Sequence, residues 1–196
     1  KLCVFHNTLI KWQKSINLIS NDSIKDIWKR HFLDSAQLYA YLRGVRGNIL
    51  DFGSGAGFPG LVLAMMGKKN IHLVESDKKK CVFLREIAML TNLEITIHNC
   101  RIESLSNIDA DMIICRALAP LNKLIDYVEI FLNKSLNGKK NYPKLLFLKG
   151  KNYRKELLEL NKKKKINFKE YSSLTDKYGK ILYISKVEKL DFDNDR

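Results

Sequence analysis

The segment "ILDFGSGAGFPGL", residues 49–61, decides the fold class. A short apolar run leads directly into glycines at positions 53, 55, 57 and 60. In a doubly wound α/β sheet, loops at the carboxyl ends of the strands face the ligand crevice. Glycine in such a loop lets the backbone turn tightly and approach a ligand without a Cβ atom in the way. The segment therefore predicts a small-molecule site directly after the first strand.

Apolar runs of strand length alternate with helical patterns along the rest of the chain. The expected strands are residues 48–52, 71–75, 94–99, 110–117 and 144–150, and the expected helices are 60–66, 78–93, 121–132 and 153–165. Residues 166–174 and 180–189 are expected to close the sheet as an antiparallel pair. This alternation predicts a doubly wound, Rossmann-like α/β sheet that is mostly parallel.

Apolar residues at helical spacing predict two further helical regions before the sheet, over 2–17 and 24–42. We therefore expect an N-terminal helical segment, residues 1–46, packed on a ligand-binding domain formed by residues 47–196.

The composition restricts the class of protein. The chain has 196 residues, enough for one domain with a full core, and it contains no apolar run of 18 or more residues, so no membrane span is expected. Its four cysteines show no CxxC spacing, which is typical of reduced thiols rather than of disulfides or a zinc site. We expect a cytoplasmic monomer that binds no metal.

The net charge of +14 is concentrated in two segments. Residues 134–169 hold 13 Lys and Arg residues against two acidic residues, and residues 1–47 hold eight against three. The glycine-rich centre is close to neutral. This distribution predicts a neutral small-molecule site beside a surface that attracts a polyanion such as a nucleic acid. The alternative is a Lys-rich composition without functional meaning.

The glycine spacing distinguishes between two classes of cofactor. The dinucleotide fingerprint is G-x-G-x-x-G, whereas Gly53, Gly55 and Gly57 form G-x-G-x-G and Phe58 takes the third glycine position. A bulky Phe58 suits a methionine-like chain better than close helix packing on a pyrophosphate. Glu75 ends the second expected strand, where a carboxylate can accept hydrogen bonds from both ribose hydroxyls. Together these residues favour S-adenosylmethionine over NAD.

The stretch "NCRIESL", residues 99–105, follows the third expected strand. That position puts Ile102 over an adenine ring and Glu103 near its amino group. The alternatives are a plain turn at the glycines and a surface position for Glu75.

Segments far apart in the chain resemble one bacterial family. "RHFLDSAQL" (30–38), "ILDFGSGAGFPGLVLA" (49–64), "CRALAPL" (115–121) and "LFLKG" (146–150) occur in the order and at about the spacing of the glucose-inhibited division protein B family. The resemblance covers nearly the whole chain, and the C-terminal end matches only loosely. It implies a cytoplasmic class I methyltransferase that uses S-adenosylmethionine. The implied target is N7 of a guanine in small-subunit (16S) ribosomal RNA, as RNA or in a small ribosomal subunit particle.

The resemblance also implies roles for single residues. By it, Gly53 and Phe58 contact the cofactor, Ile102 and Glu103 flank the adenine, and Arg116 lies at the active site.

Two basic residues are candidates for holding the target base. Arg116 follows the fourth expected strand, where many methyltransferases carry their working residues, and Lys149 ends the fifth strand. We expect Arg116 to hold the base, with Lys149 as the second candidate. The alternative for Arg116 is a surface position.

His31, Asp34 and Ser35 share one helix face because of their i, i+3, i+4 spacing. That face either covers the cofactor or target pocket, or it joins helices, with His31 as a satisfied buried histidine.

The reaction type follows partly by exclusion. After the fourth strand, "CRALAP" replaces the [DN]-P-P-[YFW] motif of exocyclic-amine methylation, and Cys115 lies within an apolar strand rather than in a nucleophile's position. N7 of guanine carries a lone pair and no proton, so it needs no general base but only alignment at about 3–3.5 Å. The alternatives are methylation of another RNA or a protein, a nucleotide-binding oxidoreductase and a non-catalytic RNA-binding module.

Overall fold

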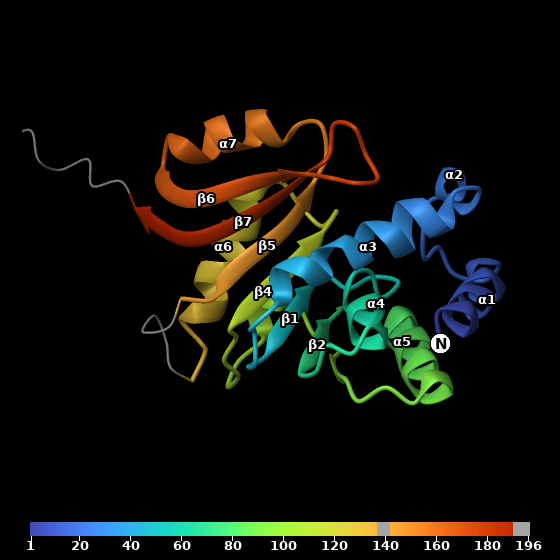
Figure 1. Cartoon of the computed structure of the whole chain (residues 1–196). Coiled ribbons are helices and arrows are strands. Elements are labelled where there is room, and N and C mark those ends of the chain that lie inside the picture. The colour runs from blue at the N-terminus through green and yellow to red at the C-terminus, as the bar shows by residue number, and fades with distance from the viewer. Residues whose placement is uncertain (137–141, 190–196) are drawn as a thin grey trace, which may run out of the picture.

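Strands from all parts of the chain after residue 48 assemble into one sheet. The structure is a computed structural model that describes residues 1–136 and 142–189. Within these residues, seven strands form a sheet in the order β3-β2-β1-β4-β5-β7-β6 (Figure 1). They are β1 (Ile49–Phe52), β2 (Ile71–Val74), β3 (Thr96–His98), β4 (Met112–Arg116), β5 (Lys144–Lys149), β6 (Lys164–Ser172) and β7 (Lys180–Lys189).

The strand directions match the sequence prediction. Neighbours among β1 to β5 are parallel, and β7 is antiparallel to both β5 and β6. The expected doubly wound sheet with an antiparallel closing pair is confirmed. The carboxyl ends of β1, β2 and β4 consequently meet at one edge, where the expected site residues follow.

Two apolar cores lie on opposite faces of the sheet, and successive strand residues alternate between them. Ile49 and Ile114 belong to one core, and Leu50 and Ile113 belong to the other. Because both faces are buried, the parallel strands read as continuous apolar runs.

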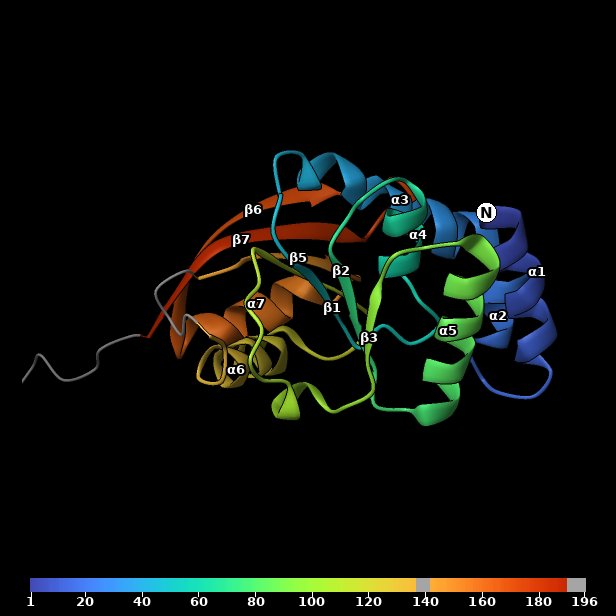
Figure 2. The same ribbon diagram turned by 90° about the horizontal axis from the view of Figure 1, so that it is seen from below.

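Helices cover both faces, which gives three layers (Figure 2). The first core contains residues of α1 (Leu2–Gln13), α4 (Gly60–Met65) and α5 (Lys78–Thr91). The second contains residues of α6 (Leu121–Leu132) and α7 (Tyr153–Asn161).

The N-terminal helical region is less regular than its spacing predicts. After α1 it consists of α2 (Asn21–Ile24), the π-helix η1 (Trp28–Leu33), α3 (Asp34–Ala36) and the 3-10 helix η2 (Gln37–Leu42). The helical character of 24–42 is confirmed, but one regular α-helix is not. Short π-helical turns are frequent at functional sites, and this one carries residues of the site described below. The domain boundary after residue 46 stays a prediction.

The C-terminal end of α7 differs from the sequence prediction. The helix ends at Asn161, and Lys164 opens β6 instead of continuing the helix. The reason is a tertiary contact, because Lys164 Nζ forms ion pairs with Asp126 at 3.0 Å and Glu129 at 2.9 Å on α6. The prediction of a helix over 153–165 was therefore wrong in its last turn.

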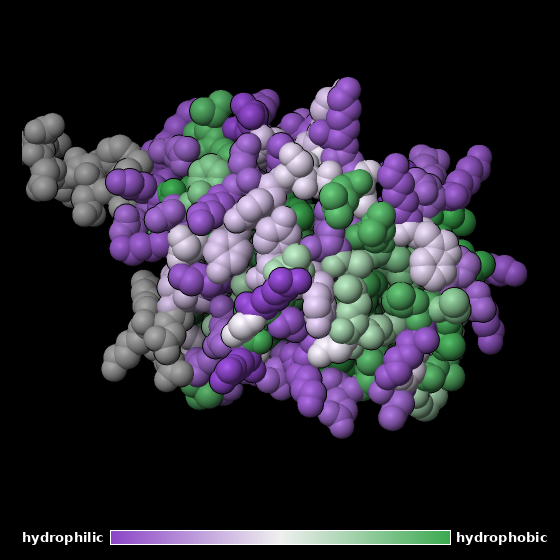
Figure 3. Space-filling model, viewed as in Figure 1, coloured by the Kyte–Doolittle hydropathy of each residue, from purple (hydrophilic) through white to green (hydrophobic). Residues whose placement is uncertain are grey.

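On the face seen in Figure 3, hydrophilic side chains dominate the rim, and apolar ones reach the surface over α3 and α4. No helix among residues 1–136 and 142–189 has the length and hydropathy that a membrane crossing requires.

Candidate active site

The loop after β1 forms one wall of a cavity of about 380 Å³. Gly53 and Gly55 have φ angles of 69° and 56°, in the left-handed region that favours glycine. A Cβ atom on Gly53 would lie 2.6 Å from Leu118 Cδ1, whereas the nearest atom to a Cβ on Gly55 is 3.8 Å away. The backbone of Gly55 is therefore bare toward the cavity.

Gly57 differs from the other two glycines. It does not line the cavity, and a Cβ atom there would lie 2.3 Å from Leu61 Cδ1. The absence of a side chain at Gly57 therefore allows the loop to pack on α4.

Glu75 follows β2 and faces the same loop. Its Oε2 accepts a hydrogen bond from the Gly55 amide at 2.9 Å, and its Oε1 accepts one from the Asp77 amide at 2.8 Å. Each carboxylate oxygen has two lone-pair sites, so both retain one for a further donor. The carboxylate is buried and lines the cavity.

Three more of the expected cofactor residues line this cavity. Ile102 and Glu103 belong to the 3-10 helix η3 (Ile102–Ser104), and Phe58 follows the glycine loop. Phe58 is almost wholly buried, and its ring stacks on Phe5 of α1 with centroids 4.9 Å apart. Aromatic contacts of Phe58 with Phe5, His31 and Phe32 thus join the N-terminal helices to the cavity wall.

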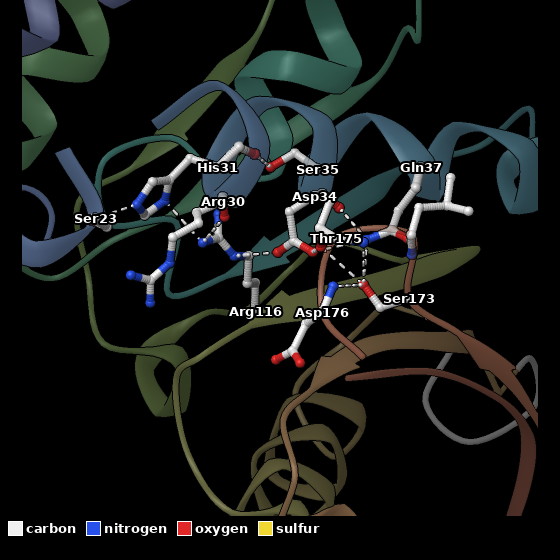
Figure 4. Close-up of polar contacts among 11 residues, drawn as sticks. Ser23, Arg30, His31, Asp34, Ser35, Gln37, Arg116, Ser173, Thr175 and Asp176 are labelled. Atoms are coloured by element: carbon white, nitrogen blue, oxygen red, sulfur yellow. Dashed lines mark hydrogen bonds and ion pairs between the residues drawn. The ribbon is translucent and has the colours of Figure 1, made fainter. Parts of the chain in front are cut away.

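Arg116 ends β4 and is held by side chains and backbone of the N-terminal helical region (Figure 4). Its Nε forms an ion pair with Asp34 at 3.0 Å, and its Nη2 donates to the carbonyl of Arg30 at 2.8 Å and to His31 Nδ1 at 2.9 Å. Its Nη1 is buried and has no hydrogen-bond partner among the described residues. The guanidinium also lies 5.7 Å from the Phe58 ring centroid.

The irregular helix supplies one of these contacts. The amide of Asp34 donates to the carbonyls of Lys29 and His31. The carbonyl of Arg30, between them, accepts from Arg116.

His31 is a buried, neutral histidine. Because Arg116 donates to Nδ1, Nε2 carries the proton and donates to Ser23 Oγ at 2.8 Å, which donates to the carbonyl of Ser20 at 2.7 Å. Burial and the nearby charges of Arg116 and Arg30 lower the pKa of His31 to about 3. Both ring nitrogens are thus engaged within the protein.

A second cavity of about 680 Å³ lies on the other side of Arg116. Arg116 and Ala117 line both cavities, and Ala117 has a φ of 52°, which is uncommon for a residue with a side chain. The loop between β6 and β7, residues 173–179, forms part of the second wall. The two cavities therefore meet at the end of β4.

Lys149 lines the second cavity but not the first. Its Nζ forms an ion pair with Glu156 at 2.7 Å and donates to the carbonyl of Ala119 at 2.9 Å. Glu156 also accepts from the Leu121 amide, so these contacts tie the loop after β4 to α7. An ammonium has three donors, which leaves one for a ligand.

Asp51 was missed by the sequence reasoning. It is fully buried in β1, its Oδ2 accepts from the Gly60 amide at 3.0 Å, and its Oδ1 has no partner among the described residues. Burial raises its pKa to about 7. The available signal was a lone acid inside an apolar strand next to the glycines. Ala117 and the 173–179 loop gave no such signal.

Among the described residues, the four cysteines form neither a disulfide nor a metal site. Cys3, Cys81, Cys100 and Cys115 are free thiols. Cys115 is buried in β4, and burial raises its pKa to about 12, which confirms its position in the core. In the part of the chain that the structure describes, no three His, Cys, Asp or Glu side chains cluster to hold a metal ion.

Solved structures of proteins with bound S-adenosylmethionine share the fold. Magnesium protoporphyrin IX methyltransferase from Synechocystis PCC 6803, with bound SAM, matches with a TM-score of 0.61 at 15% identity, over 93% of this chain and 97% of that one. A mutant of MtNAS in complex with S-adenosylmethionine matches with a TM-score of 0.63 at 12% identity, over 97% and 75%. At such identities the likeness shows the fold alone.

The sequence comparisons identify the family. The GidB family model, described as rRNA small subunit methyltransferase G, matches residues 1–182. Two proteins named Ribosomal RNA small subunit methyltransferase G are similar to the chain. The one from Paramagnetospirillum magneticum is 42% identical over 189 residues, covering 96% of this chain and 89% of the relative. The one from Rickettsia prowazekii is 40% identical over 190 residues, covering 97% and 95%. The resemblance seen in the motifs is confirmed, and the chain belongs to the GidB family.

Proposed function

We propose that this chain transfers a methyl group from S-adenosylmethionine to N7 of a guanine in 16S ribosomal RNA. The observation that carries the proposal is the junction of two cavities at Arg116 and Ala117. A methyl transfer needs one site for the donor and one for the acceptor, open to each other at the reacting atoms. The names of the relatives support the substrate class.

The first cavity fits S-adenosylmethionine. Its volume lies within the usual range for small ligands, and it combines the bare backbone of Gly55, the Glu75 carboxylate and apolar Ile102. When bound, S-adenosylmethionine supplies an electrophilic methyl group. The residues proposed to hold it are Gly53, Gly55, Phe58, Glu75, Ile102, Glu103 and Arg116, with Gly57 acting through the packing of the loop.

The site is suited to a nucleophile that carries no proton. His31 is neutral, and its one unprotonated nitrogen accepts a bond from Arg116. N7 of guanine needs no base to free its lone pair. Alignment of the acceptor therefore replaces general-base catalysis in this proposal.

Arg116 and Lys149 are proposed to hold the acceptor from two sides of the second cavity. Two nitrogens of Arg116 are bound within the protein, so its plane is fixed. A fixed guanidinium orients a base or phosphate more strictly than a free one. Lys149 retains one donor in the same cavity.

The proposed acceptor is a segment of RNA that enters the second cavity. Arg30, Lys151 and Lys177 line it, and Tyr178 exposes 62% of its surface there. Cations bind phosphates and an exposed aromatic ring stacks on bases, which is the usual combination for flipped or single-stranded nucleotides. We propose that a monomer acts in the cytoplasm on 16S RNA or on a small-subunit particle.

The test is to map N7-methylguanine in 16S ribosomal RNA from cells with and without the gene. Borohydride and aniline treatment cleaves RNA at this base. We expect one cleavage site to disappear without the gene and to return with the wild-type chain but not with Arg116→Ala. Unchanged 16S cleavage together with loss of methylation in another RNA or a protein would contradict the proposed substrate.

A further inference from the structure

Asp34 contacts both Arg116 and the loop between β6 and β7. Its Oδ2 pairs with Arg116 Nε at 3.0 Å, and its Oδ1 accepts a hydrogen bond from Thr175 Oγ1 at 2.5 Å. Thr175 belongs to the loop between β6 and β7. We propose that Asp34 is a positioning residue that couples the orientation of Arg116 to the docking of loop 173–179. The inference rests on the proposed function.

Asp34 also balances the charge of Arg116. The side chains are only 15% and 16% exposed, so water screens the pair weakly. Methylation of N7 moves positive charge onto the purine ring, and an uncompensated guanidinium beside the ring would oppose that change. The Asp34 carboxylate makes the ion pair nearly neutral overall and leaves the Nη1 of Arg116 as its unpaired donor group among the described residues.

The other carboxylate oxygen anchors the loop through a cluster of polar contacts (Figure 4). Gln37 Nε2 donates to Asp34 Oδ1 at 2.8 Å and to Ser173 Oγ at 3.2 Å, and Gln37 Oε1 accepts from the Leu174 amide at 2.9 Å. Ser173 Oγ in turn lies 2.9 Å from Thr175 Oγ1. Asp34 is the member of this cluster that also contacts Arg116.

Apolar packing does not hold the loop 173–179 in place. Leu174 is 74% exposed and Tyr178 is 62% exposed, so the large apolar side chains of the loop point to solvent. The polar cluster therefore sets how the loop sits against α3. Because Lys177 and Tyr178 lie on that loop and line the second cavity, its position affects how RNA meets Arg116.

Thr175→Val is the variant that tests the coupling, since it removes the hydroxyl and keeps the volume and the Asp34–Arg116 pair. We expect kcat for methyl transfer to small subunits that lack the modification to fall at least about threefold, with the affinity for S-adenosylhomocysteine unchanged. Thr175→Ser keeps the hydroxyl and is expected to restore kcat. Ser185→Ala, which removes a hydroxyl on β7 that donates to the carbonyl of Asn167, is the matched control.

A double-mutant cycle separates positioning from direct contact with RNA. If Thr175 acts through Arg116, Thr175→Val is expected to have no further effect on kcat in the Arg116→Lys background. A full additional loss in that background would overturn the coupling, because the loop would then act on RNA independently of Arg116.

Hydrogen exchange gives a readout that needs no substrate. Asp34→Ala removes the oxygen that accepts from Thr175 and Gln37, and we expect backbone amides in 173–179 to exchange at least about threefold faster. Unchanged exchange would overturn the anchoring role. If the wild-type chain does not methylate 16S RNA, the proposed function fails, and the exchange measurement still decides whether Asp34 holds the loop.

Discussion

His31 is the residue for which the structure separates a catalytic from a structural role. Its pKa is lowered to about 3, so it binds no proton at any pH well above that value. We expect neither His31 nor N7 to make the rate of methyl transfer depend on pH from about 6.5 to 9, because neither changes protonation there, whereas Asp51, with its pKa raised to about 7, does. The measurement is single-turnover methylation across this range for the wild-type chain and His31→Gln. A wild-type rate that falls in acid near the ordinary histidine pKa, and a His31→Gln rate that does not, would instead make His31 the base.

Most of the site could be predicted at residue level because its parts follow strand ends. Glu75 and Arg116 come directly after β2 and at the end of β4, and parallel strands bring those ends together. The partners of Arg116 could not be predicted in the same way. Thr175 reaches Asp34 across 141 positions, and no local spacing encodes that contact.

At the scale of elements, periodicity predicted the sheet well and the helix ends less well. Buried parallel strands are short apolar runs, which stand out in the sequence. The end of α7 depends instead on the ion pairs of Lys164 with α6, and a carbonyl of the π-helical turn η1 accepts a hydrogen bond from Arg116 of β4. Contacts between elements, rather than propensity within them, set these boundaries.

Two lysines of the Lys-rich junction between α7 and β6 are already paired with acidic side chains. Lys162 pairs with Glu159 at 2.8 Å and Lys164 pairs with two acids of α6. The nine residues of β6 separate this junction from loop 173–179 by about 30 Å. The cations at the second cavity, Lys151 and Lys177, are therefore better placed to meet the RNA that the site would act on.

This placement predicts how RNA affinity depends on salt. Each phosphate contact contributes roughly 0.7 to 0.9 to the slope of log K against log salt. We expect Lys151→Gln with Lys177→Gln to flatten the slope by about 1.4 to 1.8, and Lys162→Gln with Lys163→Gln to change it by less than about 0.5. Filter binding of a 16S fragment at several salt concentrations measures both. The reverse order would place the RNA along the α7–β6 junction.

At the scale of the whole molecule, the N-terminal helices and the sheet share one core. Phe5 of α1 is fully buried, stacks on Phe58 beside the cofactor cavity and meets Phe32 of η1 edge to face at 5.2 Å. Trp12 of α1 donates a hydrogen bond to Glu86 of α5 at 3.0 Å. The segment 1–46 is thus joined to the cofactor loop by buried aromatic contacts.

This shared core predicts that the chain unfolds as one unit. Both tryptophans, Trp12 and Trp28, lie in the first 46 residues, so their fluorescence reports the N-terminal segment, while far-ultraviolet circular dichroism reports the whole chain. We expect the two urea unfolding curves to coincide, as in a two-state transition. Phe5→Ala should shift both curves together and lower the free energy of unfolding by about 3–5 kcal/mol, because it leaves a cavity between α1 and the glycine loop. Val4→Ala, at a half-exposed position of the same helix, is the control and should cost less than about 0.5 kcal/mol. If the fluorescence curve moved to lower urea while the dichroism curve stayed in place, residues 1–46 would be a separately folding segment, and the contact between Phe5 and Phe58 would not join it to the cofactor site.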